Sequence, residues 1–384
     1  MENMIDTLSH FDVKKRHEAI FNVAELIKNN KIQKGQQYPY DNMHIHSFHS
    51  FNYKNWSPSR ITLEAYKIGL THIGIVDFDT LEAVEETLLS SKLFGVPAIV
   101  GIETRVYVPS LSQAVINSPG EPGVYYINGF GFNRVPDKNS DAGKIYKKLR
   151  QIAEDRNKKV VEKLNNFLFP VVIDYQTDVY PLTPSNNPTE RHIIKAYIEK
   201  SEKIPDISSD AFWADILKIS PNAVATMKKE NMGDFMEKIR SVLVKNGGPG
   251  YVKPEPKTFP TIDEFVDMAM KGSGIVIGNW LDGTNEGEKD PEQFLQFLSS
   301  TGINIVNIIP ERNWNIKDPK EKAIKVTNLD IFLSTCIRMN IPVICGTEMN
   351  KYGQPFVDNF NSPELNKYLW WFKKSVEYII QQTQ

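Results

Sequence analysis

Short runs of apolar, β-branched residues recur along the chain, and segments with helical periodicity separate them. This alternation predicts βα units around a largely parallel sheet. The predicted strands lie at residues 43–47, 72–76, 98–108, 123–132, 274–279, 303–309 and 342–345. In parallel α/β folds the functional site lies at the carboxyl ends of the strands, so polar residues at those ends are the candidates for chemistry.

The helices between these strands carry recognisable start and stop signals. Ser57-Pro58 offers an N-cap and a proline at the first helical position, and Gly69 follows as a stop. Asp290-Pro291 and Ser362-Pro363 repeat the starting signal. The aromatic cluster Trp370-Trp371-Phe372 could pack on the barrel or on a second subunit, and we favour the barrel; the sequence does not determine the oligomeric state.

The segment from residue 133 to 260 breaks the alternating pattern. It has few strand-like runs, and helices are predicted at 144–167, 210–219 and 231–245. We therefore predict an N-terminal half-barrel over 1–132, a helical insertion over 133–260 and a C-terminal half-barrel over 261–384. Acidic residues in the insertion are nearly as frequent as its lysines, which favours a solvated helical cap over a nucleic-acid surface.

Composition excludes several classes of protein. The 384 residues are 41% hydrophobic and 24% charged, as in ordinary globular proteins, and the net charge of -2 provides no field for nucleic acid or anionic membrane. Cys336 and Cys345 are too few for a disulfide framework and are interpreted as reduced core residues. The N-terminus has no apolar leader and no run of 18 apolar residues occurs, so we expect a cytoplasmic protein.

Two histidines in the first strand are the strongest chemical signal. His44 and His46 flank Ile45, and the period of two in a strand places both imidazoles on one face. Glu103 and Glu348 each end an apolar run that contains a glycine two residues earlier. Together the four side chains would complete a site for one divalent transition metal, and mixed imidazole and carboxylate ligands suit Zn, Mn or Fe.

Other polar residues at strand ends and helix starts are candidates for substrate contact. Arg105 shares a strand face with Glu103 and either pairs with it or binds an anion. Arg191 and His192 begin a predicted helix in the insertion, where a helix N-terminus would reinforce anion binding. Trp280 could form an apolar wall. Asp77 follows the second strand, where it could cap a helix, support a ligand as an outer carboxylate or accept a proton.

These motifs, in this order, resemble the PHP superfamily, the polymerase and histidinol phosphatase metal-dependent hydrolases. The stretches that carry the resemblance are His44-Ile45-His46-Ser47, residues 75–82, Val100-Gly101-Ile102-Glu103 and residues 345–350. Arg191-His192-Ile193 is similar to a motif that supplies a further histidine from a helical insertion. The resemblance implies a distorted seven-stranded β/α barrel with up to three metals at the carboxyl ends of its strands.

Several positions depart from the family pattern. Phe51 and Phe78 stand where many members have an aspartate and a metal-binding histidine; Tyr126 or Ile127, Asn279 or Trp280, Glu348 and Asn350 stand at other ligand positions. The losses fall mostly on the second and third metal sites. The first site keeps His44, His46 and Glu103, with Glu348 in place of an aspartate, so the pattern predicts one metal per chain.

The leading hypothesis is a hydrolase that acts on a small anionic substrate, phosphorylated or carboxylated. Arg105 and Arg191 would replace the positive charge of the missing metals, and Asp77 would act as general base. The loss of ligands argues against two-metal clamping of a phosphomonoester. One alternative is a catalytically idle barrel that binds a metabolite or a protein partner, which Phe51 and Phe78 favour. Another is a metal-dependent lyase or decarboxylase acting on a sugar acid.

Overall fold

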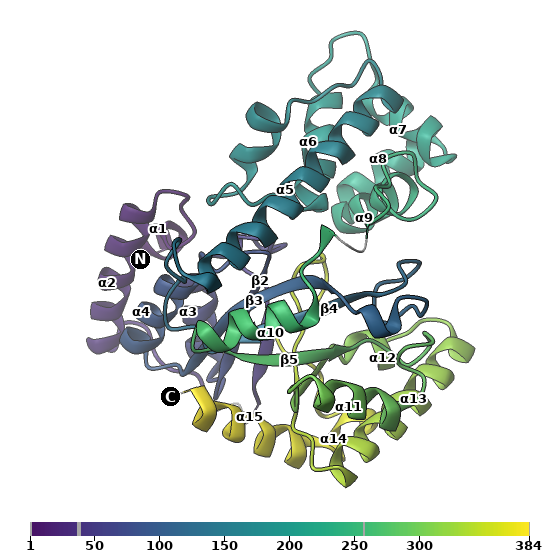
Figure 1. Cartoon of the computed structure of the whole chain (residues 1–384). Coiled ribbons are helices and arrows are strands. Elements are labelled where there is room, and N and C mark those ends of the chain that lie inside the picture. The colour runs from purple at the N-terminus through teal and green to yellow at the C-terminus, as the bar shows by residue number, and fades with distance from the viewer. Residues whose placement is uncertain (1, 37–39, 256–257, 384) are drawn as a thin grey trace.

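The computed structural model describes residues 2–36, 40–255 and 258–383 (Figure 1). Its single sheet has seven strands that hydrogen-bond in sequence order. They are β1 (Asn42–Ile45), β2 (Ile73–Phe78), β3 (Ala98–Tyr107), β4 (Val124–Phe130), β5 (Ile275–Trp280), β6 (Val306–Ile308) and β7 (Val343–Cys345). Each lies within or beside a run that the apolar pattern predicted, and the predicted seven-stranded α/β barrel is confirmed.

The direction of β4 distorts the barrel. β4 runs antiparallel to both β3 and β5, whereas all the other neighbouring strands in the sheet are parallel. A strand that pairs parallel to the strand before it must be joined to that strand by a long crossover connection. The chain between β3 and β4 contains only the short 3-10 helix η1 (Pro109–Leu111) and turns, so it re-enters the sheet from the opposite end. The sequence pattern predicted a largely parallel sheet and did not reveal this reversal.

The barrel closes between β1 and the segment that follows β7. The backbone N–H of Glu348 donates to the carbonyl of His44 at 2.8 Å, and the N–H of His46 donates to the carbonyl of Glu348 at 2.8 Å. Gly346 allows this approach, because a Cβ at that position would lie 2.3 Å from the backbone nitrogen of His44. Closure therefore places Glu348 beside both histidines.

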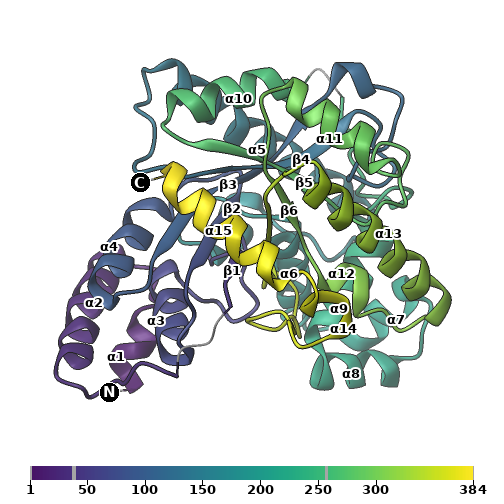
Figure 2. The same cartoon turned by 90° about the horizontal axis from the view of Figure 1, so that it is seen from below.

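An apolar layer fills the lower part of the barrel. It takes one residue from each strand or from the position beside it: Met43, Val76, Ile99, Phe130, Ile277, Ile305 and Ile344. Helix α15 (Leu369–Thr383) crosses the bottom of the barrel and adds Val376 and Ile379 to this layer (Figure 2). Closer to the mouth, the same inward face carries polar side chains: Asn128, Asn279 and Asn307 lie two residues from the floor residues of β4, β5 and β6, and Glu103 lies four residues beyond Ile99 on β3. The apolar layer is therefore a floor beneath a polar site.

Helices cover the outside of the barrel. They are α3 (Pro58–Ile68), α4 (Val84–Phe94), α10 (Ile262–Lys271), α11 (Pro291–Ser300), α12 (Glu311–Trp314), α13 (Pro319–Arg338) and α14 (Pro363–Asn366), with α1 (Glu2–Thr7) and α2 (Val13–Lys28) at the N-terminus. The predicted boundary signals of α3 are present: Ser57 Oγ accepts from the N–H of Arg60, and Gly69 is left-handed with φ 82°. No helix in the described part of the chain is long and apolar enough to cross a membrane.

The insertion is helical and has an apolar core of its own. It contains α5 (Asp141–Phe167), η2 (Tyr175–Val179), η3 (Tyr180–Leu182), α6 (Glu190–Ser201), α7 (Ser209–Leu217), α8 (Pro221–Glu230) and α9 (Met232–Leu243). The sequence predicted α5, α7 and α9 but not α8. Helix α5 extends from the barrel into the insertion (Figure 1): Leu149 packs in the barrel core, and Val160 and Leu164 pack in the insertion core.

The insertion also contacts the barrel at the start of α9. A Cβ on Gly233 would lie 2.1 Å from the Cβ of Tyr352, in the loop that follows Glu348. Only glycine at position 233 therefore allows α9 to lie this close to that loop. The insertion is thus fixed to the barrel along α5, at Gly233 and at Asn187, which donates to the carbonyls of His49 and Phe78. Its position relative to the carboxyl ends of the strands follows from contacts of this kind.

We expect Trp371→Ala to destabilise the protein by about 3–5 kcal/mol, the usual cost of removing a buried tryptophan. Trp371 is 4% exposed in the barrel core, whereas its neighbour Trp370 is 55% exposed. Trp370→Ala is therefore the matched control, with an expected cost within about 0.5 kcal/mol. Denaturant unfolding monitored by circular dichroism measures both, and equal costs would contradict the packing of α15 on the barrel.

Candidate metal centre

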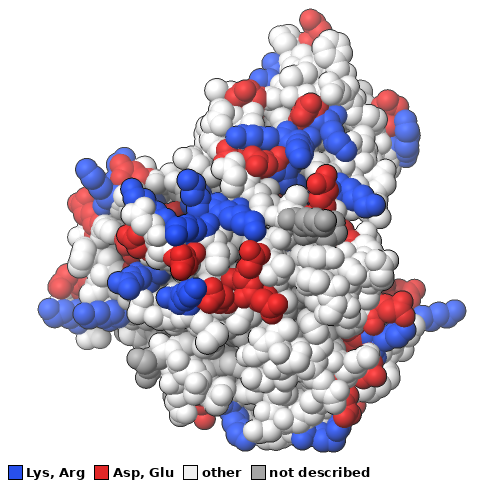
Figure 3. Space-filling model, in the orientation of Figure 1, with Lys and Arg blue, Asp and Glu red and all other residues white. Residues whose placement is uncertain are grey.

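A cavity of about 950 Å³ lies between the mouth of the barrel and the insertion. Charged side chains of both signs are interspersed on the outer face in Figure 3. The cavity wall is different in character: it contains eight cationic side chains, Arg105, Arg156, Arg191, Arg240, Lys245, Arg312, Lys317 and Lys351, against six acidic ones, Glu103, Glu121, Asp234, Glu237, Glu311 and Glu348. The balance inside the cavity is therefore positive, although the whole chain carries a net charge of -2.

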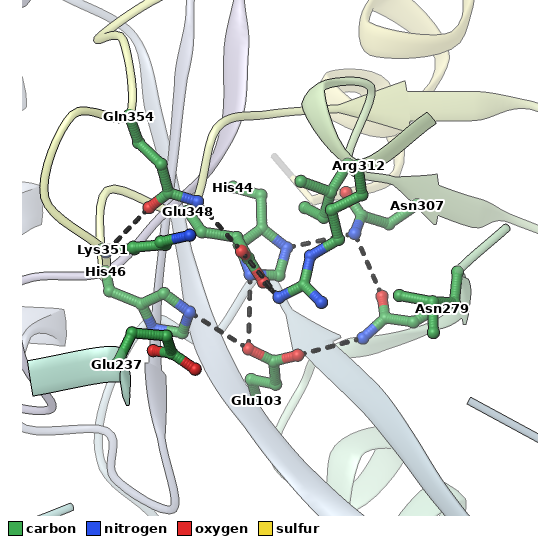
Figure 4. A network of polar contacts seen from close by, with 12 residues as sticks. His44, His46, Glu103, Glu237, Asn279, Asn307, Arg312, Glu348, Lys351 and Gln354 are labelled. Carbon is green, nitrogen blue, oxygen red and sulfur yellow. Dashed lines mark hydrogen bonds and ion pairs between the residues drawn. The ribbon is translucent and has the colours of Figure 1, made fainter. Parts of the chain in front are cut away.

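His44 and Glu103 line this cavity, and the buried His46 lies beside them (Figure 4). The Nε2 atoms of His44 and His46 lie 3.3 and 3.2 Å from Oε2 of Glu103. All three atoms are buried, and none makes a well-formed hydrogen bond within the described chain. Ligand atoms that share a tetrahedral ion with bonds of about 2.0–2.1 Å stand about 3.3 Å apart. The three side chains therefore have the spacing and the unsatisfied atoms of a metal site.

Glu348 lies beside this triad but is paired with Arg312. Ligand atoms of His44, His46 and Glu348 lie within 4.8 Å of one another. Nη2 of Arg312 donates to both carboxylate oxygens of Glu348, at 2.8 and 2.9 Å, and Gln354 donates to Oε2 at 3.2 Å (Figure 4). Burial favours the neutral carboxyl, but the charge of Arg312 outweighs it and the pKa of Glu348 is lowered. Glu348 is thus a charged fourth ligand position that shares its carboxylate with an arginine.

A buried carboxylate orients His46 from behind. Nδ1 of His46 lies 3.2 Å from Oγ of Ser50, which donates to Oδ1 of Asp77 at 2.6 Å. Asp77 also accepts from the backbone N–H and the hydroxyl of Ser47, at 2.8 and 2.6 Å. Because the Ser50 hydroxyl proton is given to Asp77, its oxygen accepts a proton from Nδ1 of His46. That tautomer leaves Nε2 of His46 with a lone pair for a metal.

Asp77 does not line the cavity and is fully buried. Of the roles that the sequence allowed, an outer carboxylate that supports a ligand agrees with this placement. A general base needs direct contact with water or substrate in the cavity, and the carboxylate of Asp77 is instead bonded to Ser47 and Ser50.

Three asparagines support His44. Nδ2 of Asn307 lies 3.0 Å from Nδ1 of His44 and donates to Oδ1 of Asn279 at 3.1 Å. Asn279 also exchanges hydrogen bonds with Asn128 and donates to Oε1 of Glu103 at 3.3 Å. These amides form the polar layer directly above the apolar floor. They fix His44 and Glu103 relative to each other without adding charge.

Aromatic rings occupy two positions where the family resemblance implied polar residues. The ring of Phe78 stacks on the imidazole of His46, with centroids 4.5 Å apart and an interplanar angle of 19°. Phe51 packs against His192 and belongs to the insertion core. Its φ of 131° is rare for a residue with a side chain and indicates a tightly constrained loop. Neither ring can bind a metal, so these two positions supply no ligand.

Two of the four residues predicted to contact substrate, Arg105 and Arg191, line the cavity. Arg105 lies 3.7 Å from Glu121 and over the rings of Tyr126 and Phe259. Arg191 lies 3.4 Å from Glu237 and over the ring of Phe51. Burial, together with the charge of Arg240, lowers the pKa of Arg191 to about 10. Both guanidinium groups retain donors that a bound anion could use.

The other two residues predicted to contact substrate, His192 and Trp280, are almost fully buried. His192 is 3% exposed, accepts from the N–H of Thr189 in a helix cap and does not line the cavity. Burial lowers its pKa to about 3, so it is neutral. Trp280 lines the cavity but is 1% exposed, because its ring stacks on Phe332 at 4.2 Å. The geometry thus gives His192 a structural position and leaves Trp280 as part of an apolar wall.

Sequence reasoning missed several residues of the site. Arg312 lies on the short helix after β6, and no motif marks it. Arg156, Arg240 and Lys245 are separated in a charged helical segment, so only the fold brings them together. Asn307 gave a weaker signal, since two asparagines, Asn304 and Asn307, interrupt the apolar run at 303–309.

Comparisons with known proteins agree with this fold. No family profile matches the sequence. A solved structure described as a candidate metal-dependent phosphoesterase from Bifidobacterium adolescentis is 16% identical, with a TM-score of 0.58 over 91% of this chain and 98% of that chain. An amidohydrolase from Chromobacterium violaceum, solved with bound sulfate and no metal, is 13% identical, with a TM-score of 0.55 over 86% of this chain and 95% of that one.

A sequence match points in the same direction. A stretch of 109 residues is 28% identical to the error-prone DNA polymerase of Cutibacterium acnes, and it covers 28% of this chain. The match spans only 10% of the polymerase, so the activity of that whole protein does not transfer. Together, these findings confirm at the level of the fold the resemblance to the PHP superfamily that the motifs indicated.

We expect the protein purified without added metal to contain about one divalent transition metal per chain, and His46→Ala and Glu103→Gln to lose it. His72→Ala is the matched control, because His72 also lies near a carboxylate, 2.8 Å from Asp41, but outside the cavity. Elemental analysis of the three variants measures the metal content. Retention of metal by His46→Ala and Glu103→Gln would refute this centre.

We expect Ser50→Ala to weaken metal binding by about 10- to 100-fold, the usual effect of removing the partner of a ligating histidine. Ser185→Ala is the control, since Ser185 makes the equivalent contact with Nδ1 of His49 at 3.1 Å, away from the triad. Titration of the metal-free proteins with Zn²⁺ against a competing chelator gives both affinities. Equal affinities would show that the Asp77–Ser50 pair does not orient His46.

Proposed function

We propose that this chain is a metal-dependent hydrolase that acts on a small anionic substrate through a single divalent ion. The observation that carries the proposal is the convergence of two buried Nε2 atoms on Oε2 of Glu103 at 3.2 and 3.3 Å, with all three atoms unsatisfied. Buried polar atoms without partners are costly, and a metal ion is the partner that two imidazoles and a carboxylate share most readily.

The ion would be held by His44, His46 and Glu103, with Glu348 at the fourth position. When bound by these residues, a divalent ion would supply the charge that lowers the pKa of water and polarises the group to be cleaved. Asp77 and Ser50 keep the lone pair of His46 directed at the ion. The asparagine layer holds the imidazole ring of His44 in position through the contact of Asn307 with Nδ1, and the Phe78 ring covers one face of His46.

The charge of the cavity supports an anionic substrate. Arg312 is 46% exposed on the cavity side and uses only Nη2 for Glu348, which leaves Nε and Nη1 for an anion next to the metal centre. Arg105 lies two residues beyond Glu103 on the same face of β3 and offers a second guanidinium. These arginines supply the positive charge that further metals would otherwise provide.

The similar proteins favour a phosphate ester over an amide. One neighbour is described as a phosphoesterase, and the amidohydrolase was solved with sulfate, an anion of similar shape to phosphate. A cavity of about 950 Å³ closed by the insertion suits a metabolite-sized ligand. We therefore place a phosphorylated metabolite ahead of a carboxylated one.

A catalytically idle barrel that binds such a metabolite is the second candidate. Two observations favour it: Arg312 engages both oxygens of Glu348, and the Phe78 ring covers His46 at a former ligand position. Both reduce the room for a metal-bound water. The two candidates differ in one outcome, turnover.

The deciding experiment is a screen of phosphomonoesters, phosphodiesters and phosphorylated sugar acids with protein loaded with Zn²⁺ or Mn²⁺, followed by release of phosphate. Turnover that is lost in His46→Ala supports the hydrolase. Metal binding without turnover on any compound, combined with a thermal shift by the same compounds, would establish the idle barrel. Product analysis by mass spectrometry separates hydrolysis from a lyase or decarboxylase reaction on sugar acids.

We expect Arg312→Gln to lower kcat/KM by about 100-fold while the metal content stays unchanged, because it removes a charge beside the reacting group. Arg338→Gln is the control: Arg338 pairs with Glu292 on the outer surface and does not line the cavity. Steady-state kinetics on the best substrate from the screen, with elemental analysis alongside, makes the test. An unchanged kcat/KM would remove Arg312 from the site.

A further inference from the structure

A second group of cations lies in the insertion, across the cavity from the metal centre. Arg156 on α5, Arg240 on α9 and Lys245 after α9 all contact Glu190, the first residue of α6. The distances to its carboxylate are 2.6 Å from Arg156 Nη2, 2.8 Å from Arg240 Nε and 3.0 Å from Lys245 Nζ. All three cations line the cavity, whereas Glu190 lies behind them.

A purely structural role does not account for this group. The carboxylate of Glu190 on α6 links this helix to α5 and α9. One cation on α5 and one on α9 would be enough to hold the three helices together. Two of the three cations have less than a fifth of their side chains exposed, 12% for Arg156 and 16% for Arg240. Burying more cations than a carboxylate can neutralise costs free energy unless another anion is present.

The excess charge remains when the neighbouring carboxylates are included. Arg240 also bonds Glu237 at 2.7 and 3.0 Å, and Arg191 lies 3.4 Å from the same carboxylate. Arg105 adds a cation and Glu121 a carboxylate, 3.7 Å apart. Asp79 also interacts with Arg105 and Arg156, although burial raises its pKa and favours the neutral carboxyl. Five cations therefore share four carboxylates. Asp234 also lines the cavity, but it accepts from Asn231 at the start of α9.

Two further observations indicate that the group lacks an anion. Nε of Arg156 is buried and has no hydrogen-bond partner in the described chain. Burial, followed by the charges of Arg240 and Arg156, lowers the pKa of Lys245 to about 8 although Glu190 opposes this shift. A bound phosphate would offer acceptors to Arg156 and would favour the charged form of Lys245.

Strand β3 carries one residue of the metal centre and one cation that interacts with the group around Glu190. Glu103 belongs to the metal centre, and Arg105 lies two residues further out on the same face, about 7 Å along the strand. The charge of Glu190 acts on Arg105, so Arg105 is electrostatically linked to the cations around Glu190 as well as being a near neighbour of Glu103 on β3. A ligand that touches both groups must therefore carry two separate anionic groups.

We propose that Arg156, Arg240 and Lys245 form a second anion-binding subsite, which holds a phosphate or carboxylate of the substrate other than the group at the metal. The proposal rests on the proposed function for the site at the metal, and it narrows the substrate to a class of compounds with two separated anionic groups. The insertion then selects the substrate, and the barrel carries the chemistry.

The first test measures inorganic phosphate binding to the metal-free full-length protein by isothermal titration calorimetry. We expect the wild type and His46→Ala to bind phosphate alike, and Arg156→Gln and Lys245→Gln each to lose at least tenfold in affinity. Lys228→Gln is the control, because Lys228 is an ion-paired lysine of the insertion that contacts Glu202 and Asp210 and does not line the cavity. Lys245 has 44% of its side chain exposed, so Lys245→Gln remains informative if Arg156→Gln does not fold.

Absence of phosphate binding in the metal-free wild type would overturn the subsite, as would affinities unchanged in both subsite variants. Failure of the proposed function is a separate result: phosphate would still bind, but the protein would hold no metal or show no turnover. The two conclusions can therefore fail independently.

A second measurement distinguishes a substrate group from a free anion. Pentane-1,5-bisphosphonate and pentylphosphonate, which contain no hydrolysable ester, are titrated into metal-loaded protein. We expect the bisphosphonate to bind at least tenfold more tightly, because its second group acts at a high effective concentration, and Arg156→Gln to remove the gain. Equal affinities would mean that the group serves a free anion, and this would overturn the assignment to the substrate.

Discussion

The two backbone hydrogen bonds between Glu348 and β1 are the constraint on which the site depends. They close the barrel where β1 and β7 do not form a regular ladder, and they require Gly346, because a side chain there would meet the backbone of His44. Glu348 and Met349 are both left-handed, with φ of 62° and 53°, so the chain turns sharply as it leaves the barrel. The turn directs the Glu348 carboxylate at the histidines and sends the following loop to Tyr352, where α9 docks. One closure thus fixes both a ligand position and the attachment of the insertion.

Positive charge at the mouth of the barrel comes from side chains where the resemblance implied additional metals. An arginine has a fixed position only if its surroundings hold it, and Arg312 is held by Glu348 and Arg105 by Glu121 and two rings. A metal ion delivers two charges at one point, whereas guanidinium groups spread theirs over planar forks that match phosphate oxygens. Such a site can orient an anion firmly. It would still activate the bound anion less strongly than a centre with several metal ions. The Phe78 ring stacks on His46 at a position where the resemblance implied a metal-binding histidine.

Local sequence patterns predicted the parts of this protein that depend on short-range geometry. The spacing of two residues in His44 and His46, and the apolar runs that end near Glu103 and Glu348, are fixed by strand periodicity alone, and all four side chains meet as expected. The reversal of β4 was not predictable, because its apolar run reads the same in both directions. Arg312 and the cations around Glu190 were not predictable either, since their meeting depends on where α12 and α9 dock. The structural position of His192 follows from a helix cap whose partner, Thr189, precedes it by three residues.

Helix α5 explains how a cap of mixed charge can present a positive wall to the cavity. Its first half packs in the barrel core and its second half in the insertion core, so Arg156, near the middle, is carried to the boundary between the two. Glu190 then draws Arg240 and Lys245 toward the same boundary. Asp234 and Glu237 of the insertion line the cavity as well, whereas Glu202 and Asp210 pair with Lys228 away from it. Composition averages over both sides of a domain, and the docking of α5 on the barrel decides which charged residues face the cavity.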